Sequence, residues 1–298
     1  MHLQIEKRTC MLKIRKILLP VEFHETSLRI LAVAGCIARR FKSEIVLVHV
    51  IAPESYSSRD WKDGKPMSGA ELLPDLLDFA EKQLGEPARR DLEGLPVKCL
   101  VLQGDASEQI VAAADDSVDL IVMSTHGRTG FFSRLIGSMT MKVMYDSDKP
   151  VLTGSRLHEV PTSDPSRAHV LCGVTFSEHS RTVLSCASKI AAEFQAKLTI
   201  AHVTPNVELY GPGGMYVDRN WKDDLYSSSQ DLIDKLCKDT GAQGATEIAS
   251  GNPGVELAKI AQKVGADLLV AGCHSSGGHL GSNGYGILAE SQIPVLSV

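Results

Sequence analysis

Two glycines in the first half of the chain are spaced in a way that suits the binding of an anion. Gly127 and Gly137 lie ten residues apart in THGRTGFFSRLIGSMTMKVM, and Gly137 and Ser138 open an apparent helix. Glycine lets a backbone approach a ligand closely, and a helix N-terminus offers free N–H donors at the positive end of its dipole. The Ser138 hydroxyl could cap the helix or donate to a phosphate oxygen, and Arg128 adds a cation. The spacing favours phosphate binding, although such turns also serve simply to close a sharp corner.

The segments that would position these residues alternate between strands and helices. Short runs rich in Val, Ile and Leu are followed by longer segments whose apolar residues recur at spacings of three and four. Strands that are apolar without alternation are buried on both faces, which indicates parallel sheets covered by helices. We expect five strands and four helices per half, with Pro74 opening the second helix and Ser27 and Ser180 at the first turn of the first helices.

The chain repeats itself with a period near half its length. ILLPVEFHETS (17–27) returns as VLCGVTFSEHS (170–180), and further segments recur in the same order. This order indicates duplication, and the segment between the halves carries two prolines and no apolar periodicity. The predicted fold class is α/β, with two tandem doubly wound domains, each a five-stranded parallel sheet with helices on both faces. The expected boundaries are a first domain at 1–155, a linker at 156–167 and a second domain at 168–298.

The glycine loop also resembles the signature of a known family. Doubly wound sheets bind ligands beyond the carboxyl ends of their strands, where strand order reverses, and the loop follows the fourth strand. It is similar to the Gly-x2-Gly-x9-Gly-Ser/Thr signature of the universal stress protein family, with Ser124 at the first glycine and nine residues between Gly127 and Gly137. The resemblance runs through both halves. It implies an adenine nucleotide alpha hydrolase-like fold and an ATP-binding, stress-response role.

The resemblance also implies which residues contact the nucleotide. In nucleotide-binding members an Asp ends the first strand, a valine of the second strand lines the adenine pocket through its backbone, and the glycine loop wraps the phosphates, usually with a divalent cation. Glu22 and Val50 match the first two positions, and Glu22 keeps the charge on an arm longer by one methylene. The predicted site for ATP with Mg²⁺ comprises Val21, Glu22, Val50, Met123, Ser124, Gly127, Arg128, Gly137, Ser138 and Met139.

The second half departs from the signature. Thr175 replaces the acid, Ser275 replaces the second glycine, and five residues separate Ser275 from Gly281. A loop four residues shorter cannot arch over a triphosphate in the same way, whereas a smaller anion could sit at the helix start. The predicted second, degenerate site comprises Thr175, Val203, Gly272, Ser275, Gly281 and Ser282.

Catalysis and a separate metal site are less favoured than nucleotide binding. His126 could act as a general base, but no partner carboxylate or nucleophile is identifiable, so slow ATP hydrolysis is the most that we expect. Cys273, His274 and His279 are zinc-ligand types, yet a structural zinc site usually takes four ligands and no further Cys or His lies nearby in sequence. The alternative function is a scaffold or small-ligand-binding protein of the same fold that binds no nucleotide.

Composition limits the possible partners and compartments. The net charge of −5 argues against a general nucleic-acid surface. No apolar run reaches the roughly 18 residues of a membrane span, and the N-terminus lacks an apolar signal region, so we expect a cytoplasmic protein without a membrane partner. The seven cysteines are interpreted as reduced core residues. We expect the terminal edge strands at 151–154 and 295–298 to pack the halves into an intrachain pseudo-dimer, with a homodimer as a further possibility.

Overall fold

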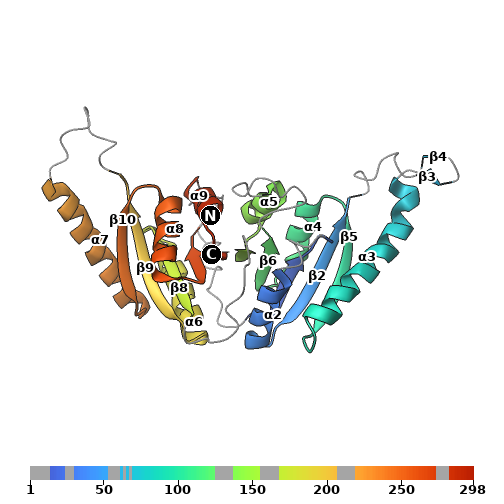
Figure 1. The fold of residues 1–298 in the computed structure, drawn as a ribbon, viewed down its shortest axis with the longest axis horizontal. Helices are drawn as coiled ribbons and strands as arrows, with labels where there is room; N and C mark the ends of the chain where they lie inside the picture. The colour runs from blue at the N-terminus through green and yellow to red at the C-terminus, as the bar shows by residue number, and fades with distance from the viewer. Residues whose placement is uncertain are drawn as a thin grey trace. The chain divides into compact units, whose positions relative to one another are not determined.

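The chain forms two compact α/β units (Figure 1). The computed structural model describes residues 14–23, 30–52, 61–62, 65–66, 69–124, 137–154, 168–206, 219–272 and 282–298. The described residues up to 154 form the first domain, and those from 168 onward form the second domain. The expected linker and Ser27 lie outside the described residues.

Each domain is built on a five-stranded parallel sheet, which confirms the predicted fold class. In the first domain the strand order is β7-β6-β1-β2-β5, and in the second it is β12-β11-β8-β9-β10. The strands of the first sheet are β1 (Lys16–Pro20), β2 (Glu44–Ile51), β5 (Val97–Gln103), β6 (Leu120–Ser124) and β7 (Val151–Gly154). Those of the second are β8 (His169–Val174), β9 (Lys197–Thr204), β10 (Ala245–Ser250), β11 (Leu268–Ala271) and β12 (Val295–Ser297). β7 and β12 are each an outer strand of the sheet of their own domain. The pseudo-twofold packing of the halves stays a prediction.

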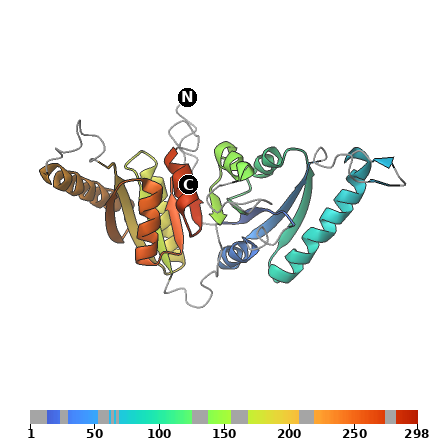
Figure 2. The same cartoon turned by 45° about the horizontal axis from the view of Figure 1, so that its top comes forward.

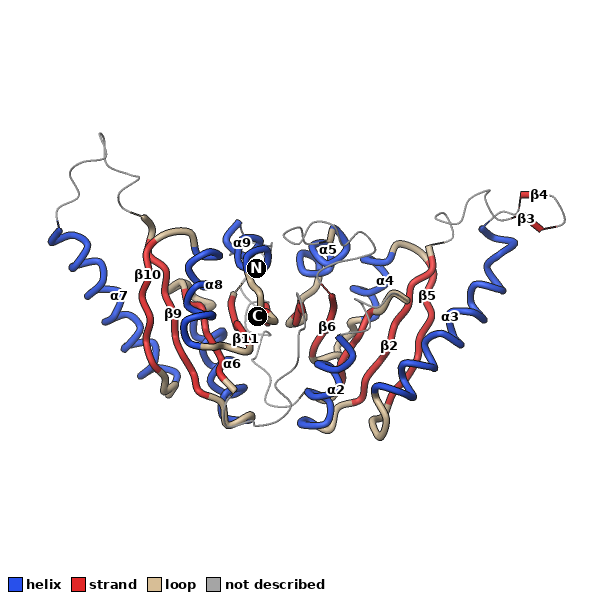
Figure 3. The backbone as a smooth tube through the Cα atoms, viewed as in Figure 1, coloured by secondary structure: helices blue, strands red, loops and turns tan. Residues whose placement is uncertain are grey.

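The described part of each domain contains the four expected helices. They are α2 (Ile30–Phe41), α3 (Gly69–Asp91), α4 (Ala106–Ala113) and α5 (Ser138–Asp146), then α6 (Ser180–Glu193), α7 (Arg219–Thr240), α8 (Pro253–Val264) and α9 (Ser282–Glu290). Figures 2 and 3 show the helices packed along the sheets. The expected start of α3 was wrong, because Pro74 lies inside a helix that begins at Gly69. Proline there removes a backbone donor, and the helix continues without that bond.

Helices cover both faces of the second sheet. A Cβ built on Gly173 of β8 would lie 3.1 Å from Leu257 of α8, whereas one built on Gly272 would lie 3.2 Å from Val183 of α6. Gly173 is the register partner of Ala271, and successive residues of a strand point to opposite faces. The helices α8 and α6 therefore lie on opposite faces, as a doubly wound fold requires.

The central strands are buried on both faces because their sequences carry no polar alternation. In β1, Ile17, Leu18 and Leu19 are each at most 1% exposed. Burying such a side chain contributes about 1.5–3 kcal/mol relative to leaving it in water. The interpretation of the cysteines as core residues holds for Cys172 and Cys186 but was wrong for Cys99, which is exposed. Cys99 lies on β5, an outer strand of its sheet, so an apolar run there does not imply burial.

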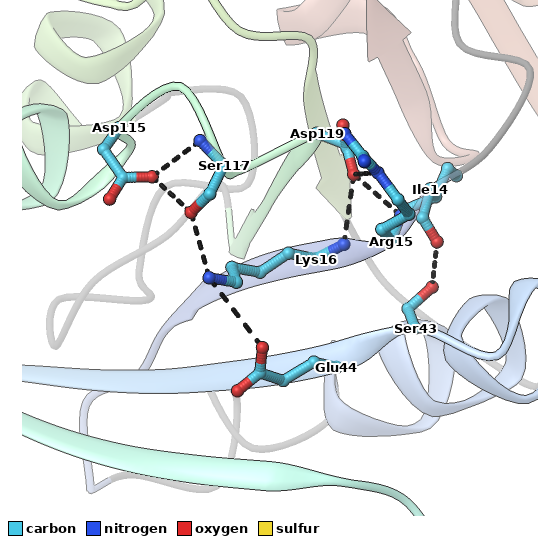
Figure 4. A network of polar contacts seen from close by, with 8 residues as sticks. All are labelled: Ile14, Arg15, Lys16, Ser43, Glu44, Asp115, Ser117 and Asp119. Carbon is cyan, nitrogen blue, oxygen red and sulfur yellow. Dashed lines mark hydrogen bonds and ion pairs between the residues drawn. The ribbon is translucent and has the colours of Figure 1, made fainter.

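In each domain a carboxylate bonds to the backbone at the amino end of a central strand, and Figure 4 shows the one in the first domain. The Asp119 carboxylate, just before β6, accepts from the backbone N–H groups of Arg15 at 2.7 Å and Lys16 at 3.2 Å. In the second domain, Asp267 accepts from the N–H of His169 at 2.8 Å. A carboxylate makes a stronger bond to an amide than a neutral acceptor does. This contact fixes the register of neighbouring strands and so places their carboxyl ends side by side.

Side chains beside this carboxylate extend the same network. The Lys16 ammonium donates to the Ser117 hydroxyl at 2.9 Å and lies 3.8 Å from the Glu44 carboxylate on β2. The buried Ser43 hydroxyl donates to the carbonyl of Ile14 at 2.5 Å. The three strands β1, β2 and β6 are therefore linked at their amino ends (Figure 4).

A small antiparallel pair of strands was not predicted. It consists of β3 (Trp61–Lys62) and β4 (Lys65–Pro66). The dipeptide Asp63-Gly64 between them is a common two-residue hairpin connection, and this was the available sequence signal. Among the described helices, none is long and apolar enough to cross a membrane.

Candidate functional site

Strand order in the first domain reverses between β1 and β6. The chain passes from β1 to β2 on one side, and β6 is added on the other side of β1. In such sheets the loops after the two strands separate and leave a crevice outside the carboxyl ends. These ends are Pro20 of β1 and Ser124 of β6.

The described residues of the predicted ATP site come from four segments around this crevice. Val21 and Glu22 follow β1, Val50 lies near the end of β2, Met123 and Ser124 end β6, and Gly137, Ser138 and Met139 begin α5. Val21 and Met123 are buried and Ser138 is exposed, whereas the others are half-buried. Gly127 and Arg128 lie outside the described residues.

The backbone of Val50 points toward the end of β1. The N–H of Gly104, after β5, donates to the carbonyl of Ile51 at 3.0 Å, so Ile51 faces β5. The N–H of Val21 donates to the carbonyl of Val48 at 2.8 Å, so Val48 faces β1. Backbone groups of alternate strand residues point to the same side. Val50 therefore directs its N–H and C=O to the β1 side, two residues beyond the last register pair of β1 and β2.

The start of α5 is anchored to the end of β6 by a buried hydroxyl. Thr140, 2% exposed, donates from its Oγ1 to the carbonyl of Ser124 at 2.9 Å. The helix N-cap is Gly137, which has no side chain to accept from the first-turn N–H groups. Ser138 is the first helical residue and not the cap, so one of its two expected roles was wrong. Its exposed hydroxyl and the first-turn N–H groups together can donate to an anion.

A cluster of charges links α5 to α4. Asp105 caps α4 by accepting from the N–H of Glu108 at 3.0 Å. The Lys142 ammonium of α5 lies 3.4 Å from the carboxylates of both Asp105 and Glu108. The pKa of Asp105 is lowered to about 2, first by the bond from the Ser107 hydroxyl and then by the Glu108 N–H. Asp105 is thus ionised at neutral pH and can attract Lys142.

One imidazole in the first domain contacts the residues on both sides of Glu22, and the sequence analysis missed it. The Nδ1 atom of His49 on β2 lies 2.9 Å from the carbonyl oxygen of Val21. Its ring stacks on that of Phe23, with centroids 4.1 Å apart. Phe79 of α3 contacts Phe23 edge-on at 6.2 Å. The available signal was the return of His49 as His202 in the repeat.

The second domain repeats this arrangement around Thr175. The Nδ1 atom of His202 lies 2.8 Å from the carbonyl of Val174, and its ring lies 4.2 Å from that of Phe176. Burial lowers the pKa of His202, and the bond to the Val174 carbonyl opposes this shift. Phe176 has a φ of 61°, a left-handed conformation that non-glycine residues rarely adopt. His202 therefore contacts the ring of a loop residue with a strained backbone and the carbonyl two residues before it.

The other residues of the predicted second site take the equivalent places. Thr175 is exposed after β8 and donates to the Ser177 hydroxyl at 3.1 Å. Val203 lies on β9, Gly272 follows β11 and Ser282 begins α9, whereas Ser275 and Gly281 lie outside the described residues. Ser180 lies in the first turn of α6, as expected, but it is not the residue that caps the helix. His179 is the N-cap, and the buried Ser180 hydroxyl has no hydrogen-bond partner within the described structure.

The helix pair α8 and α9 packs differently from its counterpart in the first domain. In the repeat, Gly254 and Gly286 stand where the first domain has Ser107 and Lys142. A Cβ on Gly254 would lie 2.4 Å from the carbonyl oxygen of Gly286. Because both residues at this crossing are glycines, the two backbones touch. Backbone contact therefore holds α9 against α8, whereas charged side chains link α5 to α4.

No resident metal site is formed by the described part of the chain, where no group of three or more His, Cys, Asp or Glu could hold an ion. The candidate zinc ligands and the candidate general base of the sequence analysis lie outside the described residues. They are Cys273, His274 and His279, and His126.

Comparison with known proteins identifies the family. The model of the universal stress protein family matches residues 13–153 and 167–298. Universal stress protein MJ0577 of Methanocaldococcus jannaschii is 33% identical over 154 residues, covering 48% of this chain and 95% of that protein. A universal stress protein from Archaeoglobus fulgidus has a similar fold, with a TM-score of 0.71, 21% identity and 96% of each chain covered. A putative universal stress protein from Pseudomonas aeruginosa gives a TM-score of 0.64 at 18% identity, over 96% of this chain and 93% of that one. The two matched segments span nearly the whole sequence, and the chain therefore belongs to the universal stress protein family, with two tandem domains of that family.

Proposed function

We propose that the first domain binds ATP at the carboxyl ends of β1, β2 and β6, and that nucleotide occupancy has a regulatory role in a stress response. The observation that carries this proposal is the convergence of three different groups where strand order reverses. They are Glu22 after β1, the Val50 backbone on β2 and the N-terminus of α5 beside β6. Family membership supports a nucleotide as the ligand.

Each group suits a different part of the nucleotide. The N–H and C=O of Val50 can pair with the donor and acceptor edge of adenine. The Ser138 hydroxyl and the first-turn N–H groups of α5 suit phosphate oxygens, and the helix dipole adds a favourable field. Gly127 and Arg128 would complete the phosphate site from the preceding loop. No rapid chemistry is proposed, because the sequence offers no identifiable nucleophile and base acting together.

The donor set fits a magnesium ion that arrives with the nucleotide. Mg²⁺ is usually held by one or two carboxylates together with substrate phosphates. Glu22 would supply the carboxylate, and the ion would neutralise phosphate charge.

We propose that the degenerate site of the second domain does not bind ATP. Thr175 offers a hydroxyl where the first domain has a carboxylate, and the loop before Ser282 is four residues shorter than its counterpart. A smaller anion suits that loop better than a triphosphate does. The competing function is a scaffold or small-ligand-binding protein of the same fold that binds no nucleotide.

Calorimetric titration of the full chain with ATP and Mg²⁺ tests the proposal. We expect one nucleotide per chain, with binding abolished by Gly137→Val and retained by the matched variant Gly281→Val. A valine at the start of α5 would crowd the phosphate. Gly281→Val changes the second domain, to which we assign no ATP. The absence of both heat and thermal stabilisation at millimolar ATP would favour the competing function. Equal loss in the two variants would overturn the assignment to the first domain.

A further inference from the structure

One side chain on the neighbouring strand contacts both the residue before Glu22 and the residue after it. His49 contacts the Val21 carbonyl through Nδ1 at 2.9 Å and stacks on the Phe23 ring at 4.1 Å. Glu22 lies between these two contacts in the sequence. The half-buried imidazole therefore contacts the backbone of the residue before Glu22 and the side chain of the residue after it.

The chemistry of the contact determines which ring nitrogen of His49 carries a hydrogen. A carbonyl oxygen accepts hydrogen bonds and cannot donate, so Nδ1 of His49 must carry the hydrogen. The Val21 N–H is also engaged, because it donates to the Val48 carbonyl at 2.8 Å. Both backbone polar groups of Val21 are thus bonded to β2, at Val48 and His49. These bonds tie the end of β1 to the strand that carries Val50.

We propose that His49 is a positioning residue for nucleotide binding, which holds Glu22 and the end of β1 in the orientation that the ligand requires. The proposal rests on the proposed function of the first domain. His49 itself need not touch the nucleotide. Its contribution is to order the loop before the ligand arrives, so that binding does not have to supply the entropic cost of ordering it.

The second domain contains the same contacts without the carboxylate, which provides an internal control. His202 contacts the Val174 carbonyl at 2.8 Å and the Phe176 ring at 4.2 Å, and Thr175 lies between them. Removing either histidine deletes the same kinds of interaction. Only His49 borders a residue of the proposed ATP site, so only its removal is expected to change ATP affinity.

The test compares His49→Ala, His49→Asn and His202→Ala in the full chain, with ATP and Mg²⁺ as the probe. We expect His49→Ala to weaken ATP binding on the order of tenfold, the loss typical for one well-placed hydrogen bond and its ordering effect. The Asn amide can still donate to the Val21 carbonyl, so His49→Asn should recover part of the affinity. His202→Ala should leave the affinity within about twofold of the parent, because the two histidines lie in different domains and share no partner, while lowering the stability of the second domain.

Two outcomes would overturn the role of His49. One is a chain that binds ATP equally well with and without His49, and the other is equal weakening by His49→Ala and His202→Ala. A parent chain that binds no ATP would instead refute the proposed function. In that case amide exchange at Val21, measured by NMR without nucleotide, still decides whether His49 orders the end of β1. Unchanged exchange in His49→Ala would refute the ordering effect itself.

Discussion

The crossing of α8 and α9 predicts unequal effects from the same substitution at its two glycines. Alanine at Gly254 would place its Cβ 2.4 Å from the oxygen and 2.5 Å from the carbon of the Gly286 carbonyl, and 3.0 Å from the nitrogen of Ile287. All three atoms are backbone, so no side chain can rotate away. Because non-bonded atoms prefer separations of about 3.5 Å, the helices would have to move apart by about 1 Å.

The cost follows from what that movement does to the packing. Overpacking a core typically costs about 1–3 kcal/mol, and a rigid backbone contact belongs at the upper end of that range. Alanine regains up to about 1 kcal/mol of helix propensity over glycine. We therefore expect Gly254→Ala to lower the free energy of unfolding of the second domain by about 2 kcal/mol. Gly286→Ala is the matched control, because the nearest atom to its Cβ is the Asn252 side-chain oxygen at 4.0 Å.

Urea denaturation followed by tryptophan fluorescence can isolate the second domain. The chain has two tryptophans, Trp61 in the first domain and Trp221 in the second. A Trp61→Phe background leaves Trp221 as the reporter. We expect Gly286→Ala to match or exceed the stability of this background and Gly254→Ala to fall below it. If Gly254→Ala proves as stable as Gly286→Ala, the close backbone crossing is not a constraint and the reasoning fails.

Two further predictions concern the first domain. Thr140→Val should destabilise the domain by about 1–3 kcal/mol, because it removes the bond to the Ser124 carbonyl. Thr140→Ser keeps the hydroxyl and should retain most of the stability. Thermal unfolding that does not separate the two variants would contradict this. Asp105 has a pKa of about 2 against an ordinary value of 3.8, so its stabilising effect is complete above 3.8 and is lost as the pH falls toward 2. Unfolding measured from pH 5 to pH 2 should therefore show a smaller acid-dependent loss in Asp105→Asn, and parallel curves for the two proteins would exclude the effect.

The sheet was predictable because its signal is local. Ile17, Leu18 and Leu19 are apolar in succession, and a strand buried on both faces requires such a run. The start of α3 was less predictable, since proline is common in the first turn of a helix, whereas α3 begins five residues before Pro74. Cys99 was misjudged for a related reason, because the sequence does not reveal which strand becomes an edge.

The candidate site was predictable only in outline. Strand order alone brings Glu22 to the crevice, but the contacts that orient it join a side chain to a distant backbone. Thr140 reaches a carbonyl sixteen residues earlier, and His49 reaches one twenty-eight residues earlier. Such contacts have no local sequence pattern. The sequence signal for the His49 contact was the recurrence of this histidine in both halves. It becomes informative once the positions of the strands are known.

The bond between Asp119 and Arg15 also has a consequence for the growing chain on the ribosome. The two residues lie 104 positions apart, and β1 pairs with β6 only after that length has been made. At translation rates of roughly 5–20 residues per second, the interval is about 5–20 s. During it, β1 and β2 can already pair while the other edge of β1 awaits its partner. An unpaired strand edge of this kind can pair with another chain, so aggregation of the nascent first domain is favoured during this interval.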